Sequence, residues 1–184
     1  EISACLVGSE MCIRDRSNWI VYRFEINPEL YGTLFTHLRD VTQWLDWIDD
    51  YPHPDLVVAS PPCTEFSTAN PVSRVNFDPD MSIVKACLDI IDYIKPQWWV
   101  LENVKGACPY ISKIIGHHKQ FIGPFYLWGE FPWIEDRRLK GYKKDIASEK
   151  SRLRTAQEVA VIPFEMSFQL KRAVETQTKL SRWS

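Results

Sequence analysis

The stretch Asp55–Cys63 reads DLVVASPPC and decides the fold class of this chain. Its short apolar run is typical of a strand buried on both faces of a parallel sheet, and paired prolines follow the run. A second strand of this kind is expected at Trp98–Leu101, which leads into Glu102-Asn103. Between them, Met81–Ile94 repeats apolar residues at helical spacing until Lys95-Pro96 stops it. Strand, helix and strand in this order predict an α/β sheet that is largely parallel.

Further patterns extend this prediction in both directions. A β-branched and aromatic strand is expected at Trp19–Phe24. A helix is expected from Asn27-Pro28, with an apolar face made by Leu30, Leu34, Phe35 and Leu38. The remaining predicted elements are a short acidic helix at Gln43–Asp50, a short helix at Pro109–Ile115, a strand at Phe121–Trp128 that Gly123-Pro124 interrupts, and a final helix at Pro163–Val174.

The first seventeen residues, Glu1–Ser17, do not share these patterns. Within them, Val7–Arg16 reads VGSEMCIRDR and resembles translated adapter sequence at the edge of an environmental sequencing read. We therefore expect residues 1–17 to be non-native and the gene to be truncated at its 5′ end, and we place the domain at residues 18–184. The alternative is an ordinary N-terminal strand and helix.

Composition excludes several classes of protein. The chain has 184 residues, 45% of them hydrophobic, and a net charge of −2. One globular domain is the default, and collagen, a coiled-coil rod and a disordered tail are excluded. The apolar runs are a few residues long, whereas a membrane-spanning helix needs ~20 residues. Five cysteines without paired spacing argue against a disulfide framework and for a reducing compartment.

Charge is distributed unevenly along the chain. The segment Arg137–Arg154 holds eight cations and two anions, a net charge of +6, which leaves −8 on the remainder. An acidic body with one basic segment is the pattern expected of a polyanion contact. The alternative is a solvated loop. The cations of interest are Arg137, Arg138, Lys143 and Lys144.

Two strand ends carry residues with reactive chemistry. In open α/β sheets, ligands bind outside the carboxyl ends of the strands, and Cys63 and Glu102 each follow a predicted strand. Paired prolines stiffen the loop that aims Cys63. A thiolate is a strong nucleophile once its pKa is lowered, and a carboxylic acid beside it can protonate a ring nitrogen. Taken singly, Cys63 also fits a small buried apolar residue, and Glu102 a surface or capping residue.

Taken together, these motifs resemble those of the DNA cytosine-5 methyltransferases. The family signature is Pro-Cys ending in Phe-Ser and then Glu-Asn-Val. Here SPPCTEFS ends at Ser67, and ENV occupies Glu102–Val104, one helix and one strand later. The resemblance covers about Trp19 to Glu175, and Ile122–Gly129 (IGPFYLWG) resembles a run in compact phage-type members.

The resemblance implies a Rossmann-like S-adenosylmethionine-dependent methyltransferase fold, with a mostly parallel sheet in a single domain. It also implies that Cys63 adds to C6 of a flipped cytosine in double-stranded DNA and that Glu102 contacts N3 and the exocyclic amine. Glu25 matches the acid that holds the cofactor ribose, Asp40 the aspartate near the adenine amine, and Pro61 a residue that lines the cofactor. A monomer in the cytoplasm of a bacterium or a phage-infected host cell is expected.

The chain departs from the family pattern in four places. The Gly-rich turn after the first strand is missing or replaced, because only Gly8 precedes Gly32. Either Ile2–Val7 takes the central place of that first strand, or the sheet has a gap or collapses there. Gly116–Gln120 stands where the family carries Gln-x-Arg-x-Arg. A basic insert at residues 130–160 replaces the usual target-recognition domain, and Ile162–Ser167 is only loosely similar to the C-terminal Asn-containing motif.

Three alternatives stay open. A metal site from Cys108, His117 and His118 matches no standard zinc spacing, so no metal is expected. An amino-methyltransferase would carry an aromatic residue where Cys63 stands and would give Glu102–Val104 no role. A catalytically inactive, DNA-binding fragment would not bind S-adenosylmethionine, and a binding measurement discriminates it.

Overall fold

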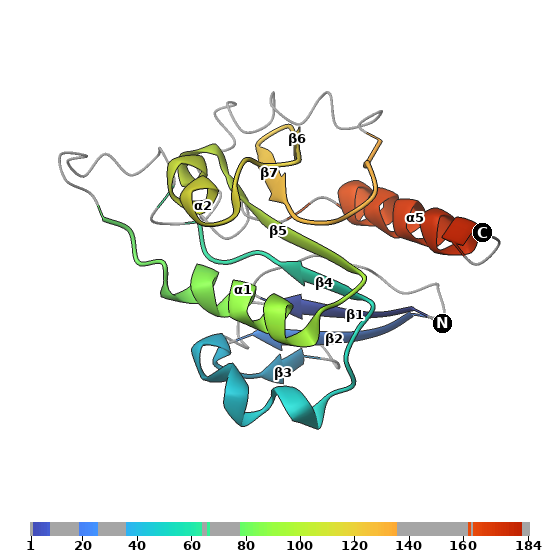
Figure 1. The fold of residues 1–184 in the computed structure, drawn as a ribbon, viewed down its shortest axis with the longest axis horizontal. Coiled ribbons are helices and arrows are strands. Elements are labelled where there is room, and N and C mark those ends of the chain that lie inside the picture. The colour runs from blue at the N-terminus through green and yellow to red at the C-terminus, as the bar shows by residue number, and fades with distance from the viewer. Residues whose placement is uncertain are drawn as a thin grey trace, which may run out of the picture.

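The computed structural model describes residues 2–7, 19–25, 36–63, 66, 78–135, 162 and 164–181, and for residues 2–7, 19–25, 36–38, 164 and 178–181 it describes the backbone alone. These residues form a seven-stranded sheet with helices on both faces (Figure 1). No helix among them is long and apolar enough to cross a membrane.

The strand order is β3-β2-β1-β4-β5-β7-β6. The first five of these strands are all parallel, and β7 runs antiparallel to both of its neighbours. The largely parallel α/β sheet is therefore confirmed. The strands are β1 (Ile2–Val7), β2 (Trp19–Glu25), β3 (Thr36–Leu38), β4 (Leu56–Ala59), β5 (Trp98–Val104), β6 (Gln120–Ile122) and β7 (Phe125–Trp128).

The strand β1 occupies the centre of the parallel half of the sheet. It pairs with β2 along Ile2–Val7 and with β4 from Ala4 to Val7. Of the two expectations for this part of the sheet, a replacement strand is correct and a gap is not. The Gly-rich loop that would follow lies in residues 8–18, outside the described residues. Whether residues 1–17 are native stays a prediction, as does the domain boundary at residue 18.

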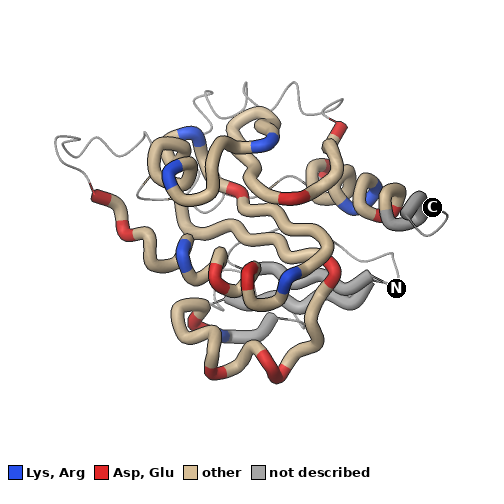
Figure 2. The backbone as a smooth tube through the Cα atoms, viewed as in Figure 1, with Lys and Arg blue, Asp and Glu red and all other residues tan. Residues whose placement is uncertain are grey.

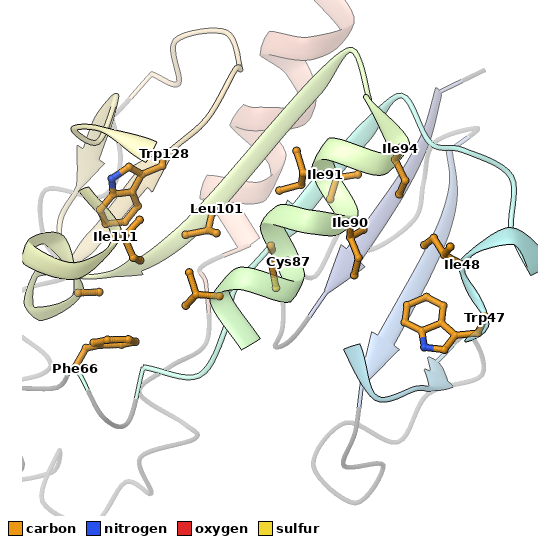
Figure 3. Close-up of a cluster of buried hydrophobic side chains, with 14 residues drawn as sticks. Trp47, Ile48, Phe66, Cys87, Ile90, Ile91, Ile94, Leu101, Ile111 and Trp128 are labelled. Carbon is orange, nitrogen blue, oxygen red and sulfur yellow. The ribbon is translucent and has the colours of Figure 1, made fainter. Parts of the chain in front are cut away.

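Helices pack on the two faces of the sheet because successive strand residues point to opposite sides. On one face, α1 (Ser82–Ile94) and α2 (Cys108–Ile115) bury side chains against Val57, Ala59 and Leu101 (Figure 3). On the other face, α5 (Phe164–Ser181) packs against a second apolar cluster with Val58 and Val100. Lys95 ends α1 in a left-handed conformation, directly before Pro96.

Several predicted elements differ in detail from the structure. Leu38, expected on a helix face, ends strand β3, because pairing with Glu25 of β2 outweighs the local helical spacing. The acidic helix at Gln43–Asp50 is two 3-10 helices, η2 (Val41–Asp46) and η3 (Ile48–Asp50). A third 3-10 turn, η4 (Lys105–Ala107), joins β5 to α2. The strand at Phe121–Trp128 is the hairpin β6–β7, with its turn at Gly123-Pro124.

Candidate active site

The carboxyl ends of the parallel strands bring most of the predicted site residues to one edge of the sheet. Glu25 ends β2, Asp40 comes two residues after β3, and the segment Ser60–Cys63 follows β4. Glu102 lies near the carboxyl end of the neighbouring strand β5, rather than after that strand. Five of the predicted residues therefore share the edge at which open α/β sheets bind ligands.

Two hydrogen bonds hold the Pro-Pro-Cys turn against β5. Ala59 pairs with Leu101, so Ser60 comes opposite Glu102 and Pro61 opposite Asn103. The Ser60 hydroxyl donates to Glu102 Oε2 at 2.9 Å, and Asn103 Nδ2 donates to the Pro61 carbonyl at 3.0 Å. Asn103 Oδ1 also accepts from the N–H of Val104 at 2.9 Å, which orients its amide. The turn that carries Cys63 is thus fixed to the strand that carries Glu102.

Glu102 is a buried carboxyl group with an unusual proton affinity. Only 7% of the residue is exposed. Burial disfavours the charged form and raises the pKa of Glu102 from 4.5 to about 7, although the bond from Ser60 acts in the opposite direction. At neutral pH both protonation states of Glu102 are therefore populated, as acid–base chemistry requires.

Cys63 is a half-buried thiol beside this carboxyl group. Burial raises the pKa of Cys63, and the negative charge of Glu102 raises it further. The carbonyl of Cys63 accepts from the N–H of Phe66 at 3.0 Å, which closes a tight turn after the cysteine. Gly106 lies directly against that turn, and a Cβ there would overlap the carbonyl oxygen of Phe66. A residue without a side chain is required at Gly106 for the turn to take this position.

The two acids predicted near the cofactor are described to different depths. The backbone of Glu25 pairs with Leu38 at the end of β2, and its side chain lies outside the described residues. Asp40 caps η2, because Oδ1 accepts from the hydroxyl of Thr42 at 2.7 Å and from its N–H at 2.9 Å. These bonds lower the pKa of Asp40, so its carboxylate stays charged.

Some of the other positions singled out in the sequence have structural roles, and the rest lie outside the described residues. Arg137, Arg138, Lys143 and Lys144 lie outside the described residues. Gln120 is buried and bonds the backbone of Ile134 twice, donating to its carbonyl at 2.7 Å and accepting from its N–H at 3.1 Å. The ring of His118 packs against that of Tyr126, with the ring centroids 4.9 Å apart.

No three His, Cys, Asp or Glu side chains gather as a metal site in the described part of the chain.

Sequence analysis missed two residues that assemble the site, Ser60 and Asn103. Both belong to the motifs SPPC and ENV, and the motifs alone indicate no role for either. The signal that could have found them is the register between β4 and β5, which places each opposite the residue it bonds. That register connects residues 42 positions apart and cannot be read from local spacing.

Comparison with known proteins places this chain in a family. The family model described as C-5 cytosine-specific DNA methylase matches residues 8–110, which is more than half of the chain and includes Cys63 and Glu102. The chain belongs to this family. The matched stretch includes the carboxyl ends of β4 and β5, where Ser60 and Asn103 join the two strands.

Individual relatives match parts of this chain. The Type II methyltransferase M.HindV of Haemophilus influenzae is 32% identical over 111 residues, which are 54% of this chain and 32% of the relative. The chain thus spans about one third of the length of that enzyme. The crystal structure of the S. pombe Dnmt2 methyltransferase aligns with a TM-score of 0.44 at 14% identity, over 84% of this chain and 59% of that chain.

Proposed function

We propose that this chain carries the catalytic centre of a DNA (cytosine-5)-methyltransferase, with Cys63 as nucleophile and Glu102 as acid. The observation that carries the proposal is the pairing of β4 with β5. Through Ser60 and Asn103 it places the Pro-Pro-Cys turn beside a buried carboxyl group whose pKa is about 7. Family membership supports cytosine as the substrate.

In this mechanism the Cys63 thiolate adds to C6 of cytosine, and the protonated Glu102 carboxyl hydrogen-bonds N3. The mechanism needs Cys63 deprotonated and Glu102 protonated, and the site couples the protonation of the two groups. A charged Glu102 raises the pKa of Cys63. Protonation of Glu102 removes that charge, which favours the Cys63 thiolate in the same state in which Glu102 can donate to N3. Addition at C6 pushes electrons toward C5, which becomes nucleophilic.

The family implies S-adenosylmethionine, which when bound supplies the methyl group that C5 receives. Once C5 carries the methyl group, loss of the C5 proton to solvent water and departure of the Cys63 thiolate would restore the ring. The strand order reverses between β1 and β4, and such a switch point forms a crevice for a nucleotide-like ligand. Carboxylates at Glu25 and Asp40 fit its ribose hydroxyls and adenine amine as hydrogen-bond acceptors, and Pro61 would line it.

Double-stranded DNA is the proposed partner, since a base must leave the stack before Cys63 can reach C6. Unstacking costs roughly a few kcal/mol, so contacts to the flanking duplex have to stabilise the opened state. The basic segment Arg137–Arg154, with Arg137, Arg138, Lys143 and Lys144, is proposed to supply contacts to phosphates.

The test is a covalent trap. A duplex with 5-fluorocytosine at target sites cannot lose a C5 proton, so with S-adenosylmethionine the chain should form a DNA adduct that survives denaturation. Cys63→Ser should abolish the adduct, whereas Cys108→Ser should keep it, because Cys108 is a comparably half-buried free cysteine on α2. Circular dichroism should show the same fold in both variants.

Two outcomes would contradict this proposal. An adduct that persists in Cys63→Ser would exclude Cys63 as the nucleophile. Failure of the unaltered chain to bind S-adenosylmethionine in a calorimetric titration would favour the inactive DNA-binding fragment instead.

A further inference from the structure

Asp40 stands where the chain leaves the outermost strand of the parallel half of the sheet. That strand, β3, ends at Leu38, which pairs with Glu25, the last residue of β2. Two residues span at most about 7 Å, so Asp40 stays at the same carboxyl edge as the crevice proposed for the cofactor. Its backbone is extended, with φ −77° and ψ 114°, and η2 begins at the next residue. The position of Asp40 is therefore set by the start of η2.

Thr42 makes two hydrogen bonds to one oxygen of the Asp40 carboxylate. The Thr42 hydroxyl donates to Asp40 Oδ1 at 2.7 Å, and the Thr42 N–H donates to the same atom at 2.9 Å. Among the described residues, Thr42 is the only donor to this carboxylate. A carboxylate has two accepting oxygens. The two bonds therefore fix the rotation of the Asp40 side chain through Oδ1 and leave Oδ2 able to accept from a ligand.

The surroundings fix the backbone of Asp40 and leave its side chain charged. Trp47 Nε1 donates to the Asp40 carbonyl at 3.1 Å, and Trp47 is itself buried in the apolar core next to Ile48 (Figure 3). Residues 40–55 hold five aspartates and no lysine or arginine (Figure 2). The bonds from Thr42 stabilise the charged form and so lower the pKa of Asp40. Asp40 is thus a charged acceptor whose orientation depends on Thr42.

We propose that Thr42 is a positioning residue, which holds Asp40 so that Oδ2 accepts a hydrogen bond from the exocyclic amine of the cofactor's adenine. The inference rests on the proposed function and adds which atom of Asp40 meets the ligand and what keeps it there. An acceptor that is ordered before binding loses no rotational freedom when the ligand binds. Ordering one side chain on binding would cost about a three- to ten-fold change in affinity.

The first test compares two ligands by isothermal titration calorimetry. They are S-adenosylhomocysteine and its analogue with hydrogen in place of the adenine amine. Thr42→Val removes the hydroxyl and should weaken binding of S-adenosylhomocysteine about three- to ten-fold, while the affinity for the analogue stays unchanged. Thr42→Ser keeps the hydroxyl and should bind both ligands as the unaltered chain does. The matched control is Thr176→Val, because Thr176 is exposed on α5 and donates its hydroxyl to the Arg172 carbonyl at 2.8 Å; both affinities should be unchanged.

The second test changes the ligand that Asp40 prefers. Both groups of Thr42 are donors, so in Asp40→Asn they select the amide oxygen and turn the amide NH2 toward the ligand. This variant should bind S-inosylhomocysteine, whose purine carries a carbonyl group in place of the amine, more tightly than S-adenosylhomocysteine. The unaltered chain should show the opposite preference, because a carboxylate and a carbonyl oxygen are both acceptors.

The outcomes separate this proposal from the proposed function. Equal weakening of both ligands in Thr42→Val would indicate a merely structural residue and would overturn the role of Thr42 alone. An unreversed preference in Asp40→Asn would do the same. Absence of S-adenosylhomocysteine binding by the unaltered chain would overturn this proposal together with the proposed function.

Discussion

The proton affinity of Glu102 should depend on the hydroxyl of Ser60. Ser60→Ala removes the buried hydrogen bond of 2.9 Å to Glu102 Oε2. A hydrogen bond to a charged group contributes ~1.5–3 kcal/mol, and one pKa unit corresponds to ~1.4 kcal/mol. Because the bond favours the charged carboxylate, its loss should raise the pKa of Glu102 by about one to two units above its value of about 7.

The assay is a carbon-13 NMR titration of glutamate side-chain carboxyls, with the Glu102 signal assigned by its loss in Glu102→Gln. The alkaline limb of the pH profile for adduct formation should move upward by the same amount, since the protonated acid binds N3. Ser60→Thr keeps a hydroxyl and should leave the pKa near that of the unaltered chain. An unchanged or lowered pKa in Ser60→Ala would refute the argument that this bond sets the charge state of the acid.

Three further predictions concern stability, the turn and DNA binding. Burial raises the pKa of Glu102 in the folded chain, so the contribution of Glu102 to stability is full below pH 4.5 and is lost as the pH rises through about 7. In chemical unfolding, Glu102→Gln should be no more stable than the unaltered chain near pH 4.5 but more stable by about 3 kcal/mol at pH 8. Equal stabilities at pH 8 would contradict the raised pKa. Gly106→Ala should push the Phe66 turn away and abolish most adduct formation at a cost of about 1–3 kcal/mol in stability, whereas in Gly116→Ala, where a Cβ meets nothing, the adduct should persist despite backbone strain. A variant of the basic segment carries alanine at Arg137, Arg138, Lys143 and Lys144. It should bind all DNA sequences more weakly, and its affinity should depend less steeply on salt concentration. An unchanged salt slope would mean that the segment is a solvated loop.

The sequence by itself determined the elements whose pattern is local. The apolar run before Ser60 and the helical spacing of 81–94 each reflect a periodicity that the backbone geometry imposes on neighbouring residues. The strand ends then placed Cys63 and Glu102 at one edge, because parallel strands joined by a helix must point the same way. The class of fold and the proximity of Cys63 and Glu102 could therefore be predicted.

The remaining features could be seen only in three dimensions, because strand register and burial depend on residues far apart in the chain. The bond from Ser60 to Glu102 exists because β4 pairs with β5 in one register, across 42 positions. Burial between packed layers raises the pKa of Glu102, and no pattern in ENV predicts it. Leu38 joined a strand because backbone pairing with β2 outweighs the local helical spacing. Ile2–Val7 became the centre of the parallel half of the sheet because it pairs with both β2 and β4.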